Sequence, residues 1–182
     1  MRERVILAPT HTSFFDVPLM YLYFVSRRLR IFSLKEAVSS KILGPLARGA
    51  GVIPYDRDAK GGFDLKAFKM TDEILEGNGC VVMFPQGHIV EDGKLEGHDL
   101  KLGLATHSLR RDVPIIPIVF GNKTRPLTIN KMYIGDPIYP KDYFDVVEAS
   151  KENIAKFTDI IQQKMIELQS ISQKHCKKVK EK

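Results

Sequence analysis

The sequence lacks the features of a secreted or membrane-spanning protein. Only two of its 182 residues are cysteines, Cys80 in an apolar run and Cys176 in a polar segment, so we expect no disulfide and a reducing compartment. The longest apolar run, Val17–Val25, has nine residues including a proline, which is too short to cross a bilayer. Residues 2–4 are charged and lead straight into an apolar run, so the start of the sequence shows no signal-peptide pattern.

The positive charge of the sequence is not spread evenly along the chain. The formal net charge is +6, but residues 174–182 hold five lysines and one glutamate and so contribute +4 of it. No aromatic residues interrupt this basic segment, so we expect no nucleic-acid binding. Such a segment suits an anionic membrane surface or an acidic carrier protein, and most simply a solvated chain end. We therefore predict a domain over residues 1–173 and a disordered basic tail over 174–182.

Short apolar runs alternate with helical patterns along the chain. Strands are expected at Val5–Ala8, Arg30–Leu34, Gly51–Pro54, Cys80–Phe84, Val113–Phe120 and Lys131–Ile134. Helices are expected from Asp16, over Glu36–Arg48, Asp64–Glu76 and Lys101–Arg111, and from Ser150 onward. This alternation predicts an α/β fold: one domain with a mixed, mostly parallel central sheet flanked by helices on both faces. Segment 85–99 is polar and holds three glycines, which favours a long functional loop.

A histidine and an aspartate follow the first predicted strand. His11 comes in the loop at the strand's carboxyl end, and Asp16-Val17-Pro18, after four intervening residues, predicts a helix start. A loop of this length allows the carboxylate to meet one imidazole nitrogen while the other faces a cleft. Such a pair can take a proton from a hydroxyl, because the carboxylate fixes the tautomer and stabilises the imidazolium. Taken alone, the two residues fit a helix cap and an ordinary loop histidine better.

Four further segments follow this pair in order. They are Leu34-Lys35-Glu36, Gly51-Val52-Ile53-Pro54-Tyr55-Asp56-Arg57, Phe84-Pro85-Gln86-Gly87-His88 and Val113-Pro114-Ile115-Ile116-Pro117. Together with the His-x4-Asp pattern, they resemble the glycerolipid acyltransferases of the 1-acylglycerol-3-phosphate acyltransferase type, from about Val5 to about Phe120. Each motif is short and weakly specific, but the ordered set at plausible spacing is a strong signal.

The resemblance implies a catalytic pair and a phosphate site. His11 resembles the general base that deprotonates an acceptor hydroxyl, and Asp16 resembles the carboxylate that orients it. Lys35 and Arg57 resemble the cations that hold the acceptor's phosphate; Arg meets phosphate oxygens with a planar fork, whereas Lys acts as a point charge. Read without the motifs, Lys35 is a solvated helix-start residue and Arg57 a surface partner of a neighbouring aspartate.

The third motif departs from the family pattern. Family members usually read Phe-Pro-Glu-Gly-Thr-Arg, whereas this chain has Gln86 for the Glu, His88 for the Thr and Ile89 for the Arg. A glutamine keeps hydrogen-bonding capacity but carries no charge. The resemblance still implies substrate-binding roles for Gln86 and Gly87. It implies the same role for Lys101, since Leu100-Lys101-Leu102-Gly103 resembles the family's Phe-Lys-x-Gly segment.

The resemblance implies an O-acyltransferase that moves a fatty acyl group from acyl-CoA or acyl carrier protein to a glycerophospholipid precursor such as 1-acylglycerol-3-phosphate. Those donors are co-substrates, and no metal or bound cofactor is implied. Gln86 and Ile89 leave open an acyltransferase for another lysolipid or amphiphilic acceptor. A non-catalytic lipid- or acyl-carrier-binding protein of the same fold also stays open. No Gly-x-Ser-x-Gly elbow is present, which argues against a serine hydrolase.

A peripheral position on the cytoplasmic face of a membrane is also expected. Members of the family commonly carry a helical, often membrane-associated segment before the His-x4-Asp pattern, whereas ten residues precede His11 here. Membrane contact is then expected to depend on exposed apolar residues near an acyl groove. Basic residues would assist it, among them Arg27, Arg28, Arg30 and the tail.

Overall fold

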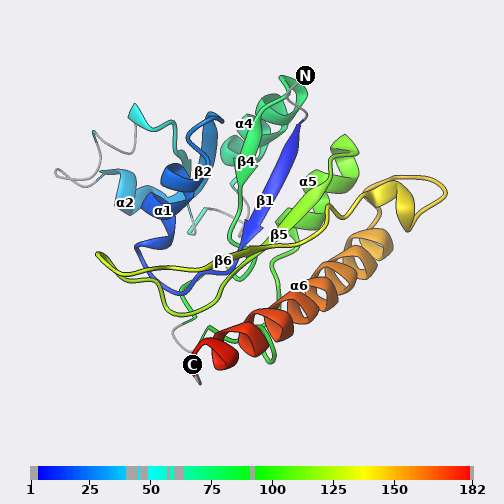
Figure 1. The fold of residues 1–182 in the computed structure, drawn as a ribbon. Helices are drawn as coiled ribbons and strands as arrows, with labels where there is room; N and C mark the ends of the chain where they lie inside the picture. The colour runs from blue at the N-terminus through cyan, green and yellow to red at the C-terminus, as the bar shows by residue number, and fades with distance from the viewer. Residues whose placement is uncertain are drawn as a thin grey trace.

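The computed structural model describes residues 4–39, 45, 49–56, 58–59, 64–90 and 93–180. Six strands form one sheet in the order β3-β2-β4-β1-β5-β6 (Figure 1). In chain order the elements are β1 (Val5–Pro9), α1 (Asp16–Tyr23), β2 (Leu29–Leu34), α2 (Lys35–Ser39), β3 (Ile53–Tyr55), α4 (Leu65–Glu76), β4 (Cys80–Val82), α5 (Gly103–Arg111), β5 (Ile115–Phe120), β6 (Met132–Ile134), a 3₁₀ turn (Pro140–Asp142) and α6 (Lys151–Lys180).

The sheet is parallel except at one edge. Strand β1 pairs in parallel with β4 and β5, and β2 pairs in parallel with β4 and β3. Only β6 among the six strands is antiparallel, and it follows β5 through a turn-rich connection. The prediction of an α/β fold with a mixed, mostly parallel sheet is therefore confirmed.

Helices cover both faces of this sheet. Along β1, Ile6 and Ala8 belong to the core on the side of α4, α5 and α6, whereas Val5 and Leu7 pack on the opposite side with Met20 of α1. The same two layers are visible in Figure 1, where α1 lies on one side of the sheet and α5 and α6 on the other. Because both faces are buried, the strand reads as a continuous apolar run rather than as an alternating one.

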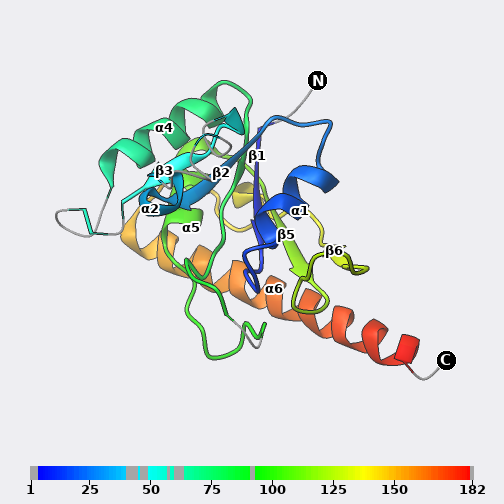
Figure 2. The same cartoon turned by 90° about the vertical axis from the view of Figure 1, so that its left-hand side faces the viewer.

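Local sequence explains where the longer helices begin and which faces they bury. Helix α4 begins after Asp64, whose side chain accepts a hydrogen bond from the backbone N–H of Ala67 at 2.9 Å. Helix α6 crosses under the sheet (Figure 2) and buries Phe157, Ile161 and Met165 at helical spacing. Helix α6 thus follows the periodicity that predicted it, and α4 begins next to the Asp64 at which its expected range starts.

Most strand ends and the start of α5 differ from expectation by one or two residues, and two helix boundaries differ by more. Helix α2 covers only Lys35–Ser39 of the helix expected over 36–48, and most of the remainder lies outside the described residues. Helix α6 continues to Lys180, through most of the segment 174–182 that we expected to be a disordered tail. Propagating an established helix adds one hydrogen bond per residue fixed, so a Lys-rich end can extend it even without packing.

Candidate functional site

The candidate site forms where the carboxyl ends of neighbouring strands meet. The loop after β1 carries His11, the loop after β4 carries Gln86, and the connection after β5 carries Thr124. Because β4, β1 and β5 are adjacent and parallel, their following loops lie at one edge of the sheet. Crevices at this edge are the usual ligand sites of open α/β sheets.

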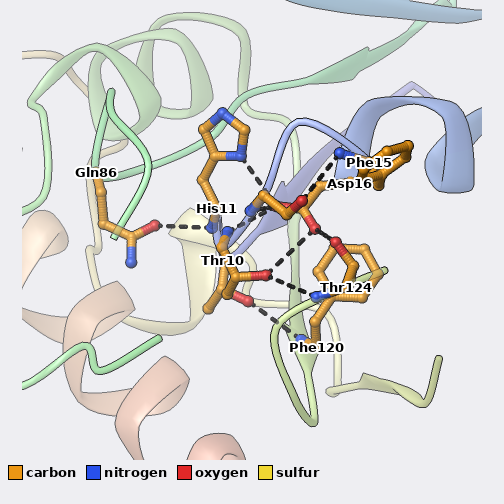
Figure 3. A network of polar contacts seen from close by, with 9 residues as sticks. Thr10, His11, Phe15, Asp16, Gln86, Phe120 and Thr124 are labelled. Carbon is orange, nitrogen blue, oxygen red and sulfur yellow. Dashed lines mark hydrogen bonds and ion pairs between the residues drawn. The ribbon is translucent and has the colours of Figure 1, made fainter. Parts of the chain in front are cut away.

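A fully buried carboxylate organises the loop after β1 (Figure 3). Asp16 Oδ2 accepts hydrogen bonds from the backbone N–H groups of Thr12 and Ser13, at 2.6 and 2.9 Å. Its Oδ1 accepts from the hydroxyls of Thr12 and Thr124, at 3.3 and 2.5 Å. Oδ2 also lies 3.0 Å from Nδ1 of His11. This many donors can hold a charged carboxylate in a buried position.

The helix-cap interpretation of Asp16 is wrong. Helix α1 begins at Asp16 itself, its N-cap residue is Phe15, and no side chain caps the helix. The carboxylate turns back to the preceding loop instead, where it bonds Thr12, Ser13 and His11. The residue therefore belongs to the loop's polar network rather than to the helix end. Pro18 does lie in the first turn, as expected.

Both the imidazole and the backbone of His11 are held in place. Its Nδ1 faces Asp16, and its ring stacks on Phe84 with a centroid separation of 4.1 Å. Its backbone N–H donates to Gln86 Oε1 at 3.2 Å, and its carbonyl accepts from the N–H of Val90 at 2.8 Å. The side chain remains 16% exposed, and its second ring nitrogen points away from Asp16 (Figure 3). This nitrogen is the one available to a ligand.

Gln86 lies beside the loop that carries His11. The residue is fully buried, and its carboxamide oxygen is the acceptor for the His11 backbone N–H. Its Nε2 has no hydrogen-bond partner among the described residues. The hydrogen bond fixes the amide orientation, because the opposite orientation would place two N–H groups against each other. Gln86 thus contacts the His11 loop through its oxygen, and its substrate-binding role stays a prediction.

Gly87 and Lys101 are brought together beside Gln86. The backbone of Gly87 has a φ of +70°, in the left-handed region that favours glycine. A Cβ at this position would approach the Lys101 side chain to 3.2 Å, so the two residues are in close contact. The backbone N–H of Lys101 also donates to the carbonyl of Pro85 at 2.8 Å. The long loop after β4 therefore returns to its own beginning at these residues.

Lys35 and Arg57 are the cations expected to bind phosphate, and among the described residues Lys35 has no polar contact with His11. Lys35 opens helix α2 after β2, two strands from β1 at the same edge of the sheet. Its side chain is 62% exposed, and Nζ lies 3.4 Å from Asp56 Oδ2. Arg57 lies outside the described residues. The phosphate-binding role of both residues stays a prediction.

Sequence reasoning missed Thr12 and Thr124 as partners of Asp16. Thr124 lies in the segment 122–130, which reads only as a turn-rich connection. The available signal was that Thr124 comes shortly after β5, a strand that pairs with β1. Its meaning depends on the strand order, because only the adjacency of β1 and β5 places Thr124 against Asp16.

A second histidine–aspartate pair, also missed from sequence, joins α4 to α5. His107 Nδ1 lies 2.7 Å from Asp72 Oδ1, both residues are buried, and Phe68 stacks on the imidazole. Burial lowers the pKa of His107 below its usual 6.5, although Asp72 acts to raise it. Burial acts to raise the pKa of Asp72, but hydrogen bonds from His107 and Arg111 outweigh it and hold that pKa below 3.8. This pair connects two helices of the core and has no open face like that of His11.

This pair predicts a measurable pH dependence of stability. As the pH falls through 6.5, the unfolded chain's His107 takes up a proton that the folded pair resists, so the free energy of unfolding should decrease. His107→Gln keeps a donor for Asp72 but does not titrate, so its unfolding free energy should change less between about pH 7 and pH 5. Urea unfolding across this range measures both slopes. The exposed His175→Gln is the matched control, and an unchanged slope in His107→Gln would contradict the assignment.

Comparison with known proteins defines the class of this chain. The family model described as Acyltransferase matches residues 1–121 of 182, a range that contains His11, Asp16 and Gln86. The chain therefore belongs to the acyltransferase family. It is 24% identical over 170 residues to the 1-acyl-sn-glycerol-3-phosphate acyltransferase of Bacillus subtilis (strain 168), covering 91% of this chain and 81% of that protein.

A solved structure agrees with the fold. The crystal structure of the 1-acyl-sn-glycerophosphate (LPA) acyltransferase PlsC from Thermotoga maritima superposes with a TM-score of 0.66. The match covers 92% of this chain and 67% of that chain, at 18% sequence identity. At this identity the likeness concerns the fold alone, and it matches the six-stranded α/β architecture described above.

Proposed function

We propose that this acyltransferase moves a fatty acyl group from acyl-CoA or acyl carrier protein to a hydroxyl of a glycerophospholipid precursor, with 1-acylglycerol-3-phosphate as the leading acceptor. The observation that carries the proposal is the His11–Asp16 pair in a chain of this family. Asp16 is buried and bound by four donors besides His11, so its geometry does not depend on the histidine. The similarity to 1-acyl-sn-glycerol-3-phosphate acyltransferases of two bacteria supports the choice of acceptor.

The chemistry follows from the two imidazole nitrogens. Nδ1 keeps its proton and donates to Asp16, so Nε2 is free to accept the proton of the acceptor hydroxyl. The oxygen then attacks the thioester carbonyl carbon and forms a tetrahedral intermediate. Its collapse breaks the carbon–sulfur bond, and the His11 imidazolium returns the proton to the departing thiolate. Asp16 stabilises the imidazolium between these steps.

A different acceptor is supported by one observation. Gln86 and Ile89 stand where the family usually has a Glu and an Arg, so two charged groups are missing together. Gln86 keeps a neutral hydrogen bond to the His11 loop. A lysolipid or other amphiphile without a phosphate monoester would suit this less charged loop. A non-catalytic binder of the same fold, in contrast, would not need the His11–Asp16 pair.

Product analysis separates these possibilities. The purified protein is incubated with acyl-CoA or acyl-acyl carrier protein and a panel of lysolipids and glycerol phosphate, and products are identified by mass spectrometry. Formation of phosphatidate from 1-acylglycerol-3-phosphate as the preferred reaction supports the proposal. Preference for a neutral or zwitterionic lysolipid supports the alternative acceptor. If no donor and acceptor give any product while the protein binds them, the chain is a non-catalytic binder.

The phosphate-binding prediction has its own kinetic test. We expect Lys35→Gln and Arg57→Gln to raise the apparent KM for a phosphorylated acceptor, because each removes a cation from its phosphate. A lost charge-assisted hydrogen bond is worth about 1.5–3 kcal/mol, or roughly 10–150-fold. The KM for the acyl donor should change little, and Lys69→Gln on α4 is the exposed control. Equal effects on both substrates would contradict this assignment.

A further inference from the structure

Helix α1 presents apolar side chains on its outer side as well as its inner side. Met20 is buried against the sheet, with Val17, Leu19, Tyr21 and Phe24 partly buried around it. Exposed apolar side chains nevertheless lie along the outer side and at both ends of the helix: Pro18 and Leu22 within it, Phe14 and Phe15 just before it, and Val25 just after it. No charged residue occurs between Asp16 and Arg27. A helix that is apolar all round is usually covered on both sides by protein or lipid.

The connection between β5 and β6 extends this apolar surface. Leu127 and Ile129 are almost fully exposed at its tip. The hydroxyl of Tyr23, at the end of α1, donates to the carbonyl of Asn130 at 2.6 Å. This contact places the connection beside α1. We call the exposed apolar side chains of residues 14–25 and of this connection, with the cations that flank them, the docking surface.

The charge of the docking surface has one sign. Segments 14–28 and 121–131 contain five cations, namely Arg27, Arg28, Lys123, Arg125 and Lys131. Their one acidic residue is Asp16, which is fully buried. Exposed apolar groups flanked by cations, without exposed carboxylates, complement the surface of a bilayer that contains anionic lipids.

We propose that the docking surface binds an anionic lipid bilayer, with Leu127, Ile129, Leu22 and Val25 inserted among the headgroups. The inference rests on the proposed function, since a lysolipid acceptor and its diacyl product reside in such a bilayer. The same two segments also build the site: Asp16 begins α1, and Thr124 of the β5–β6 connection donates to it. Docking therefore brings the bilayer next to His11. No helix among the described residues has the length and apolar composition needed to span a membrane, so this contact is at the surface.

Flotation of the full chain with vesicles tests the proposal directly. The probes are vesicles of pure phosphatidylcholine and vesicles of phosphatidylcholine that contain phosphatidylglycerol. Wild-type protein should bind the second kind more tightly, and added salt should weaken this binding. Leu127→Ser with Ile129→Ser should weaken it about tenfold or more, through lost apolar burial. Arg28→Gln and Arg125→Gln should each weaken it about fivefold.

Matched variants keep the test independent of folding and of turnover. Val146→Ser and Lys69→Gln change exposed residues outside the docking surface and should bind vesicles like wild type. The side chains changed in the docking-surface variants and in these two controls are exposed, and unchanged thermal melting curves verify the fold. His11→Ala should also bind like wild type, so vesicle binding is tested even if the proposed reaction fails.

Three outcomes would overturn the proposal. The first is no binding to either kind of vesicle. The second is binding that the Leu127–Ile129 and arginine variants leave unchanged. The third is self-association in sedimentation experiments that Leu127→Ser with Ile129→Ser abolishes while vesicle binding persists, which would assign the surface to a second copy of the chain. Binding that depends on the docking surface, together with an absence of acyl transfer, would uphold the lipid contact and reject the proposed reaction.

Discussion

His11→Ala is expected to lower the rate of acyl transfer by about 10²–10⁴-fold, the usual contribution of a general base. Its fold should survive, because the contacts that anchor this residue to Gln86 and Val90 are made by the backbone. Asp16 keeps its four other donors when the imidazole is gone. The measurement is kcat with saturating acyl-CoA and acceptor, alongside thermal melting of both proteins.

His88→Ala is the matched control for this result. His88 is exposed in the loop after β4, and its Nδ1 lies 2.9 Å from the nearby carbonyl oxygen of Gln86. Its loss should leave kcat near the wild-type value, which would also exclude it as a second base. Turnover by His11→Ala at the wild-type rate would remove His11 from the mechanism.

Asp16→Asn is expected to lower kcat by about 10²-fold or more without unfolding the protein. The asparagine oxygen can replace Oδ2 as acceptor for the backbone N–H groups of Thr12 and Ser13. Its amide nitrogen would then face the hydroxyls of Thr12 and Thr124, which can accept as well as donate. The variant therefore keeps the geometry but removes the charge that stabilises the imidazolium.

Asp16→Ala serves as the contrasting variant. It leaves two buried backbone N–H groups without partners, which costs about 1–3 kcal/mol for each group. Urea unfolding should therefore show a large loss of stability for Asp16→Ala and a small loss for Asp16→Asn. Thr124→Val, which keeps the charge and the side-chain shape, should retain more activity than Asp16→Asn. A wild-type kcat in Asp16→Asn would show that the carboxylate has no electrostatic role.

Strands and the first pair of site residues could be predicted because their signals are local. The run Val5–Ala8 is apolar and stopped by Pro9, and the following loop holds both His11 and Asp16. Spacing alone, however, suggested that Asp16 caps a helix. The structure shows the carboxylate turned back onto the loop, because two backbone N–H groups there require an acceptor.

Contacts between distant segments could not be predicted in the same way. Gln86 reaches the His11 backbone across 75 residues, and Thr124 reaches Asp16 across 108 residues. His107 and Asp72 are paired because α4 and α5 pack side by side. No sequence spacing encodes these pairings, since they depend on the strand order and on which helices share a face of the sheet.

The central position of β1 also sets an order for folding. Its partners are made much later in synthesis: Val5 pairs with Cys80, and Ile6 pairs with Ile115. Strand β1 must therefore wait, without its sheet neighbours, until β4 and β5 have been synthesised. Such long-range parallel pairing is slow and leaves apolar strands exposed in the meantime. The polar network at the end of β1 is complete only when Thr124, which follows β5, has bonded to Asp16. A nascent chain therefore completes this candidate site late in folding.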